Sequence, residues 1–214
     1  GIGAAMGTVF GVPLGLLLGG LTSWRVSILL ITIVGALALI GIFSSWGREL
    51  PGVDAPSLVA RLRSIGSGPN LMTVTVTLFT GIASLGLYTY IASLLGDTGL
   101  ASHPTAGIWA WGVGGAVGVM LIGRLVDRVG DSLRVTAVIL ALLTIVLVVL
   151  GTGPAVWLLA AALFAWGALG WSSLAPQQDT LLATNPRDGA TAVAANASAN
   201  YLGSAIGSAL GAGV

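Results

Sequence analysis

The side chains that could do chemistry in this chain are uncharged and lie inside long apolar segments. Within residues 71–95, hydroxyl groups and a glycine recur at the spacing of one helical stripe, at Thr73, Thr77, Gly81, Ser84 and Tyr88. A polar stripe inside a bilayer must face water, a substrate or another helix, because lipid offers no hydrogen-bond partner. These residues therefore predict either substrate binding or helix association.

Amide and aromatic side chains add further candidates. Asn196 and Asn200 lie one helical turn apart, and their amides could bind a substrate or simply hydrogen-bond a neighbouring helix; the sequence leaves both readings open. Trp166, and Trp109 or Trp111, could reach a cavity. The tryptophans near segment ends suit an interfacial belt, namely Trp24, Trp46, Trp157 and Trp171. Beyond Pro176, the run Gln177, Gln178 and Asp179 predicts a solvated helix end.

Several kinds of chemistry are excluded. The middle of each apolar segment holds no Asp, Glu, His or Arg, and the chain contains no cysteine. The single histidine, His103, falls in a predicted external loop. Because there is no metal cluster, no nucleophile beside a base and no phosphate-binding loop, we expect no enzyme activity, no metal and no cofactor.

Composition identifies the elements that must position these residues. Only 7% of the residues are charged, 56% are hydrophobic, and the mean hydropathy is +1.01, whereas a soluble domain carries roughly 25% charged residues. Apolar runs long enough to cross a bilayer predict seven membrane helices. Their expected ranges are 1–20, 24–46, 71–95, 106–123, 135–151, 155–175 and 189–214.

The basic residues set the orientation. All eight are arginines, and seven of them fall in alternate connections: Arg48, Arg61, Arg63, Arg124, Arg128, Arg134 and Arg187. The other connections hold only Arg25, so the positive-inside rule places the 47–70 loop in the cytoplasm. That loop is expected to be a linker with a short surface helix. The net charge of +1 and the absence of a basic block exclude nucleic acid as a partner.

Small residues recur at every fourth position in the first and last segments. The first ladder is Gly3, Gly7, Gly11, Gly15 and Gly19; the second is Thr191, Ala195, Ala199, Gly203, Gly207 and Gly211. This spacing lets a neighbouring backbone approach closely. The ladders are six helices apart, which predicts two related six-helix halves. We expect each ladder to slide against the opposing half, with span one crossing the glycine-rich middle of span four, at Gly112, Gly114, Gly115 and Gly118.

Three runs resemble the major facilitator superfamily, and within it the bacterial drug and sugar efflux branch of proton antiporters. The first is similar to the antiporter motif of the fifth helix, at Gly7, Gly11, Pro13, Gly15, Gly19 and Gly20, followed by Trp24 and Arg25. The second resembles the cytoplasmic loop signature between helices eight and nine, at Gly123, Arg124, Asp127, Arg128 and Gly130, although Asp131 and Ser132 stand where basic residues are common. The run from Asn200 to Gly203 is similar to helix eleven.

The resemblance implies an all-α polytopic membrane protein, a partial major facilitator fold with about seven of twelve expected transmembrane helices. Residues 1–46 would be the last two helices of the N-terminal half, 47–70 the cytoplasmic linker, and 71–214 the C-terminal half, truncated before its last helix. The chain, which opens and stops inside hydrophobic runs, is expected to be a fragment of a longer protein.

The residues themselves predict further roles. Pro13 lacks a backbone N–H and would bend the fifth helix. Asp127 would form an inner latch with the positive end of span one, or else belong to a solvated loop with incidental ion pairs. The resemblance implies that Tyr90 matches a cavity-lining aromatic position. The substrate cavity candidates are Tyr88, Tyr90, Trp111, Trp166, Asn196 and Asn200.

The implied function is export of small drug-like, apolar or sugar-like molecules across the bacterial inner membrane by alternating access, in exchange for protons. The coupling carboxylate is expected in the first half, outside this chain, and no oligomer is implied. Two alternatives stay open: an uptake permease of the same fold, and a membrane scaffold or sensor that transports nothing.

Overall fold

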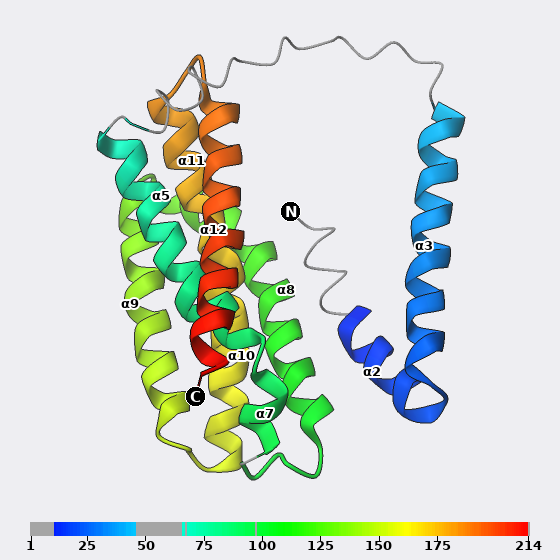
Figure 1. The fold of residues 1–214 in the computed structure, drawn as a ribbon. Helices are drawn as coiled ribbons and strands as arrows, with labels where there is room; N and C mark the ends of the chain where they lie inside the picture. The colour runs from blue at the N-terminus through cyan, green and yellow to red at the C-terminus, as the bar shows by residue number, and fades with distance from the viewer. Residues whose placement is uncertain (1–10, 46–65, 67, 97, 214) are drawn as a thin grey trace. The chain divides into compact units, whose positions relative to one another are not determined.

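The chain is described by a computed structural model over residues 11–45, 66, 68–96 and 98–213, and all the secondary structure in these ranges is helical (Figure 1). The all-α expectation is therefore confirmed. The chain divides into two compact units, Phe10–Ala55, and Gly1–Val9 together with Pro56–Val214. One of its two boundaries, between Ala55 and Pro56, falls within the range predicted as a linker.

The smaller unit is a helical hairpin of α2 (Val12–Leu21) and α3 (Trp24–Ser45). Pro13 stands in the first turn of α2. The Ser27 hydroxyl of α3 donates to the carbonyl oxygen of Gly15 at 2.7 Å, and a Cβ at Gly19 would lie 3.4 Å from Ser27 Oγ. Part of the first ladder thus contacts α3. The bend expected at Pro13 involves residues 1–10, which lie outside the described residues.

The larger unit is a bundle of helices. Its first four elements follow one another along the chain and are together called the first helical path: α5 (Gly68–Thr80), the π-helical turn η2 (Gly81–Leu85), α6 (Gly86–Tyr88) and α7 (Ile91–Gly96). It continues through α8 (Pro104–Val129), α9 (Ser132–Gly151), α10 (Val156–Ser172), α11 (Leu174–Thr184) and α12 (Gly189–Gly211). Gly130 ends α8 in the left-handed region, with φ 68°. The carboxylate of Asp131 then caps α9 by accepting from the Arg134 backbone N–H at 3.0 Å.

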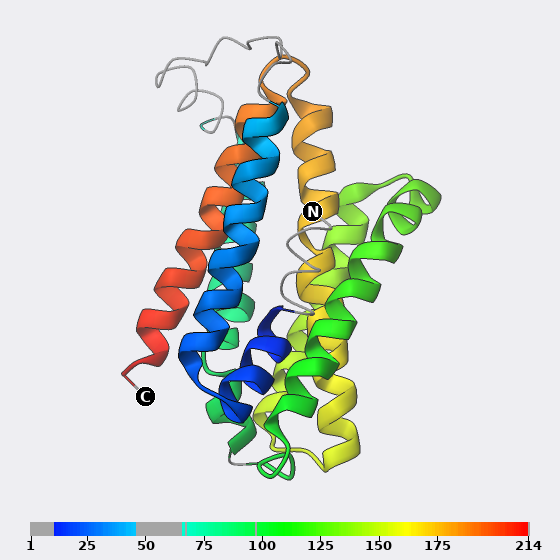
Figure 2. The same cartoon turned by 90° about the vertical axis from the view of Figure 1, so that its right-hand side faces the viewer.

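Five helical stretches in the described ranges are long and apolar enough to cross a membrane: Trp24–Ser44, Gly68–Tyr88, Pro104–Val129, Ser132–Gly151 and Val156–Thr184. The last of these joins α10 and α11 into one path, which Figure 2 shows running along the bundle. The predicted end of this span at 175 was wrong, because Pro176 stands in the first turn of α11 and does not stop the helix. α12 has 23 residues but many alanines, serines and glycines, and it falls outside the five.

The glycines of α8 pack against α10. A Cβ at Gly114 would lie 2.0 Å from the carbonyl oxygen of Phe164, and one at Gly118 would lie 2.2 Å from that of Ala168. From the other side, a Cβ at Gly167 would lie 1.9 Å from the Trp111 carbonyl oxygen. Gly114 and Gly118 therefore contact α10. The crossing expected between span one and span four involves residues 1–10, which lie outside the described residues, and it stays a prediction.

The second small-residue ladder packs within the same bundle. A Cβ at Gly203 would lie 2.2 Å from the Leu78 carbonyl oxygen, and one at Gly207 would lie 2.3 Å from that of Ile82. A Cβ at Gly86 would in turn lie 2.6 Å from the Gly207 Cα. α12 therefore lies backbone to backbone along α5, η2 and α6 (Figure 1). The expectation that this face slides against the opposing half was wrong, because the glycines are covered by their own bundle.

Candidate functional site

A cavity of about 200 Å³ opens between the helices of the larger unit. Its lining side chains come from α5, η2, α8, α10, α11 and α12: Thr80, Ser84, Leu85, Trp111, Gly170, Trp171, Leu174, Gln178, Ala197, Asn200 and Tyr201. Hydroxyls, amides and indoles alternate there with apolar groups. No lining side chain is charged at neutral pH, so the cavity suits an uncharged ligand.

Trp111 forms the centre of an aromatic cluster in the wall of this cavity. The Tyr88 ring stacks on it at 4.2 Å between centroids, with an interplanar angle of 22°. Trp166 and Trp171 meet it edge to face, at 5.8 Å and 6.1 Å. These geometries are the favoured ones for aromatic pairs. Because rings contact it on several sides, the orientation of the Trp111 indole is fixed.

The π-helical turn brings Ser84 to the same wall. Gly81, at the start of the turn, allows close approach to α12, since a Cβ there would lie 2.5 Å from the Asn200 carbonyl oxygen. Ser84 Oγ accepts a hydrogen bond from Trp166 Nε1 at 2.8 Å. By contrast, the buried Trp111 Nε1–H has no acceptor among the described residues. π-helical turns of this kind are frequent at functional sites.

A buried polar cluster next to the cavity ties three helices together. Thr77 Oγ1 lies within hydrogen-bond distance of Thr73 O at 3.1 Å, of Asn196 Oδ1 at 2.6 Å, and of Gln177 Oε1. Gln177 Nε2 donates to Ser173 O at 2.9 Å, which fixes the orientation of that amide. A hydroxyl has one proton and cannot donate to three oxygens. Turning the Asn196 amide would let its nitrogen donate to Thr77 Oγ1 instead.

The structure places the predicted cavity residues in different surroundings. Trp111 and Asn200 line the cavity. Tyr88 stacks behind Trp111, and Trp166 is fully buried between Trp111 and Ser84. Asn196 belongs to the buried polar cluster. The two readings left open for the asparagines therefore divide, with Asn196 in helix contacts and Asn200 at the cavity.

Tyr90 does not line this cavity. Its hydroxyl donates to the carbonyl oxygen of Ser208 on α12, and a Cβ at Gly211 would lie 2.4 Å from its ring. In this structure Tyr90 therefore holds α12 against the end of the first helical path.

Three residues of the larger unit lie in surroundings that differ from those expected from the sequence. Gln177 and Gln178 were expected at a solvated helix end, but Gln177 is 1% exposed and Gln178 lines the cavity. Trp171 was expected in the interfacial belt and instead lines the cavity beside Trp111. Trp171, Leu174 and Gln178 follow one helical stripe across Pro176. That spacing was the signal that the helix continues.

The cytoplasmic loop motif lies at the end of α8. Gly123, Arg124, Asp127 and Arg128 are exposed. The single ion pair within the described ranges joins Arg134 Nε to Asp131 Oδ2 at 3.7 Å. The predicted partner of Asp127 is the start of span one, which lies outside the described residues, as does Gly7.

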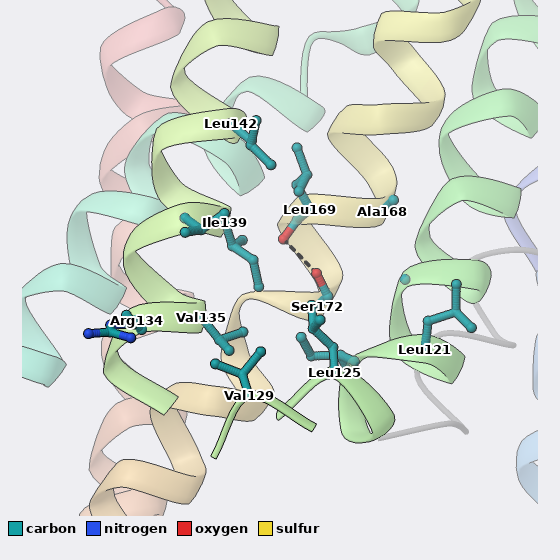
Figure 3. A pocket seen from close by; sticks show the side chains of 13 residues that line it. Leu121, Leu125, Val129, Arg134, Val135, Ile139, Leu142, Ala168, Leu169 and Ser172 are labelled. Carbon is teal, nitrogen blue, oxygen red and sulfur yellow. Dashed lines mark hydrogen bonds between the residues drawn. The ribbon is translucent and has the colours of Figure 1, made fainter. Parts of the chain in front are cut away.

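A second hollow of about 320 Å³ lies between α8, α9 and α10 (Figure 3). Apolar side chains such as Leu125, Ile139 and Leu169 make most of its wall, and the Ser172 hydroxyl is bonded to the Leu169 carbonyl oxygen at 3.3 Å. None of the candidate site residues lines it. We therefore place the candidate site in the polar cavity.

Comparison with known proteins identifies the family. The family model of the Major Facilitator Superfamily matches residues 1–208. A protein of Mannheimia succiniciproducens described as a probable sugar efflux transporter is 32% identical over 198 residues, which cover 90% of this chain and 49% of that protein. The inner membrane transport protein YdhP of Escherichia coli K12 is 27% identical over 217 residues, covering 100% of this chain and 55% of the relative.

A third relative carries a different description. The transcription regulatory protein OpdE of Pseudomonas aeruginosa is 31% identical over 187 residues, covering 80% of this chain and 44% of that protein. The chain thus spans about half the length of the curated relatives it matches.

Proposed function

Because this chain belongs to the major facilitator superfamily, we propose that it is part of a carrier that exports small uncharged molecules across the bacterial inner membrane by alternating access. The observation that carries the proposal is the cavity of about 200 Å³ inside the membrane bundle, whose wall is aromatic, amide-bearing and uncharged. Such a wall suits reversible binding of a neutral solute rather than catalysis. Trp111 and Asn200 contact the substrate, and Tyr88 and Trp166 hold Trp111 in place.

Export is favoured over uptake by two observations. Gly11, Pro13, Gly15, Gly19 and Gly20 follow the helix-five pattern of the antiporters, and a relative with 32% identity is described as a probable sugar efflux transporter. We propose protons as the coupling ion. The described membrane helices hold no carboxylate at depth, so the coupling carboxylate belongs to a part of the transporter outside them.

Transport by everted membrane vesicles that carry the intact transporter tests this function. An exporter that exchanges substrate for protons accumulates substrate inside such vesicles when their interior is acid. We expect accumulation that a protonophore abolishes and that vesicles without the transporter lack. No accumulation under this gradient, together with uptake by intact cells, would favour the permease of the same fold.

A second candidate function is membrane-bound regulation, favoured by the relative described as a transcription regulatory protein. A regulator would change gene expression without moving solute. Restoration of export by the full-length gene in a pump-deficient strain supports the carrier. A change in transcript levels with no export in either direction would support the regulator instead.

A further inference from the structure

We infer that a phospholipid of the cytoplasmic leaflet binds on the surface of the larger unit, with one acyl chain in an apolar groove and its phosphodiester at Arg134. The apolar groove is the hollow of about 320 Å³ between α8, α9 and α10 (Figure 3). It shares no lining residue with the polar cavity. The inference therefore goes beyond the proposed function and depends neither on the solute nor on the direction of transport.

The wall of the apolar groove is almost entirely hydrocarbon. Its floor is the buried cluster of Ile122, Val135 and Ile139. Of the lining side chains, only Arg134 and Ser172 are polar, and the Ser172 hydroxyl already donates to a carbonyl oxygen of its own helix at 3.3 Å. Water gains no hydrogen bond from such a floor, so the groove favours an apolar occupant.

The groove is open to the surface along its length. Leu121 and Leu125 of α8 are 54% and 45% exposed, and Val138 and Leu142 of α9 are 57% and 46% exposed. These side chains form two walls on either side of the buried floor (Figure 3). A hydrocarbon chain in the groove is therefore contacted on three sides, whereas a flat helix surface contacts it on one. Dispersion attraction grows with the number of such contacts.

The dimensions of the groove match one leaflet of a bilayer. Along α9 the lining runs from Arg134 to Leu142, about 12 Å of helix, and one leaflet supplies about 15 Å of hydrocarbon. Arg134 follows a connection assigned to the cytoplasm, so the groove runs inward from that surface. An apolar cavity of about 150 Å³ holds the six carbons of benzene, so a groove of about twice that volume takes roughly a dozen chain carbons.

Arg134 supplies the charge that a phosphodiester needs. Its side chain is 81% exposed, so its stem can border the groove while the guanidinium stays among the headgroups. Asp131 Oδ2 lies 3.7 Å from Arg134 Nε, which is too long for a hydrogen bond. Within the described ranges the guanidinium therefore has no hydrogen-bond acceptor. A guanidinium binds two phosphate oxygens through parallel N–H bonds.

The neighbouring charges also favour an anion at this end of the groove. Arg128 lies three residues after the lining residue Leu125, and therefore on the near side of α8. Asp127 lies two residues after Leu125, and therefore on the opposite side of the helix. The Asp131 carboxylate already accepts from the Arg134 backbone N–H at 3.0 Å. A phosphodiester there meets two arginines and one carboxylate that is engaged in capping α9.

Photolabelling of the intact transporter in lipid nanodiscs tests the inference. The probe is a phosphatidylglycerol with a diazirine halfway along one acyl chain, and peptide mass spectrometry locates the adducts. We expect adducts to concentrate on residues 121–129 and 135–142. A diacylglycerol with the same photoreactive chain lacks the phosphodiester and should label these residues about fivefold less.

Replacing Arg134 tests the contact with the phosphodiester. Arg134→Gln keeps a polar side chain but removes the charge, so labelling of the groove by the phosphatidylglycerol probe should fall about fivefold. Labelling by the diacylglycerol probe should not change. Arg187→Gln is the matched control, because Arg187 is an exposed arginine of another connection assigned to the cytoplasm and does not line the groove.

A second variant tests the seat of the acyl chain. Val138→Trp adds an indole to the wall of the groove and should remove most of the adducts there. Val148→Trp is its control, because Val148 is 64% exposed on the same helix and lies outside the groove. Both positions are exposed, so neither substitution overpacks the core.

Several results would overturn the inference. Adducts no denser in the groove than around Val148 would indicate ordinary annular lipid. An unlabelled groove would indicate that another segment of the intact protein covers it. Equal labelling of Arg134→Gln and Arg187→Gln would remove the phosphodiester contact. The assay contains no transported solute, so its failure leaves the export proposal standing, and failure of vesicle accumulation leaves the lipid site standing.

Discussion

At the residue scale, the buried hydroxyl of Thr77 joins three helices that are far apart in the sequence. It lies on α5 and contacts the amides of Gln177 on α11 and Asn196 on α12. All three side chains are at most 1% exposed. Buried polar networks are strong when fully satisfied and costly when one member is removed. This cluster therefore stabilises the bundle beside the cavity.

Replacing Thr77 by valine should destabilise the larger unit. The valine keeps the shape but leaves the Gln177 amide oxygen buried without a donor, at a cost of about 1–3 kcal/mol. Thermal unfolding of the purified transporter should show a lower Tm. Thr144→Val is the control, because Thr144 is exposed on α9 and its hydroxyl bonds only within its own helix, to Leu140 O at 2.8 Å. Equal Tm values for the two variants would contradict the role given to the cluster.

The sequence was a good guide to which side chains of 71–95 turn inward. Thr73, Thr77, Gly81 and Ser84 are buried, as their common helical stripe predicted. It did not identify their partners, because Gln177 was read as part of a solvated helix end. The span was predicted to end at 175, and in the structure Pro176 stands in the first turn of α11, where its missing N–H does no harm. Because the span was predicted to end at 175, Trp171 was assigned to the interfacial belt and Gln178 to a solvated helix end.

At the scale of the elements, glycine positions decide which helices touch. At Gly167 of α10 and at Gly114 of α8, the backbone of the other helix lies so close that a Cβ would overlap with it. The same holds for Gly203 and Gly207 of α12 against α5 and η2. Close packing of small residues is the main source of helix association in lipid. These two contacts hold the walls of the cavity in place.

Gly167→Ala should separate α8 from α10. Its methyl group would meet the Trp111 carbonyl oxygen at 1.9 Å, and since that atom is backbone, the helices must move apart. Overpacking costs about 1–3 kcal/mol, and a displaced Trp111 should also weaken ligand binding. Thermal unfolding and binding of a neutral solute such as methyl glucoside measure the two effects. Gly151→Ala is the control, because a Cβ at Gly151 meets nothing within 4 Å; if it destabilises as much as Gly167→Ala, the packing account fails.

The ladders were recognised from spacing, yet the partner predicted for the second ladder was wrong. A glycine at every fourth position indicates that some backbone comes close and does not say which one. Because the ladders are six helices apart, both were expected to face the opposing half. The second instead packs on α5, η2 and α6, since Gly81 and Gly86 supply the complementary small surface there.

At the scale of the whole molecule, two features bear on the change between inward-facing and outward-facing states: the uneven distribution of arginines between the two sides of the membrane, and the loop motif at the end of α8. Seven arginines lie in the connections assigned to the cytoplasm. Asp127 lies exposed near the end of α8, between Arg124 and Arg128 in the sequence. A carboxylate there is available to the positive N-terminal end of a helix, a contact typically of about 0.3–1 kcal/mol. We propose that it favours the outward-facing state.

Asp127→Asn should then shift the balance inward. Removing the charge keeps the size of the side chain, so accessibility of a cytoplasm-facing reporter label in the intact transporter should rise by up to about fivefold. Asp179→Asn is a suitable comparison, since the Asp179 carboxylate accepts from the Ser132 hydroxyl within the same bundle. Unchanged labelling in Asp127→Asn would remove the latch from the mechanism.

The central claim is that the polar cavity is the substrate site of an alternating-access carrier, and labelling of a single cysteine tests it most directly. The 214 residues contain no cysteine, so Asn200→Cys introduces a unique thiol of this chain into the cavity wall. The account predicts modification by a membrane-impermeant thiol reagent from either side of the membrane, and protection from both sides by a bound neutral solute. Modification from one side alone, or labelling that no neutral solute slows, would contradict it.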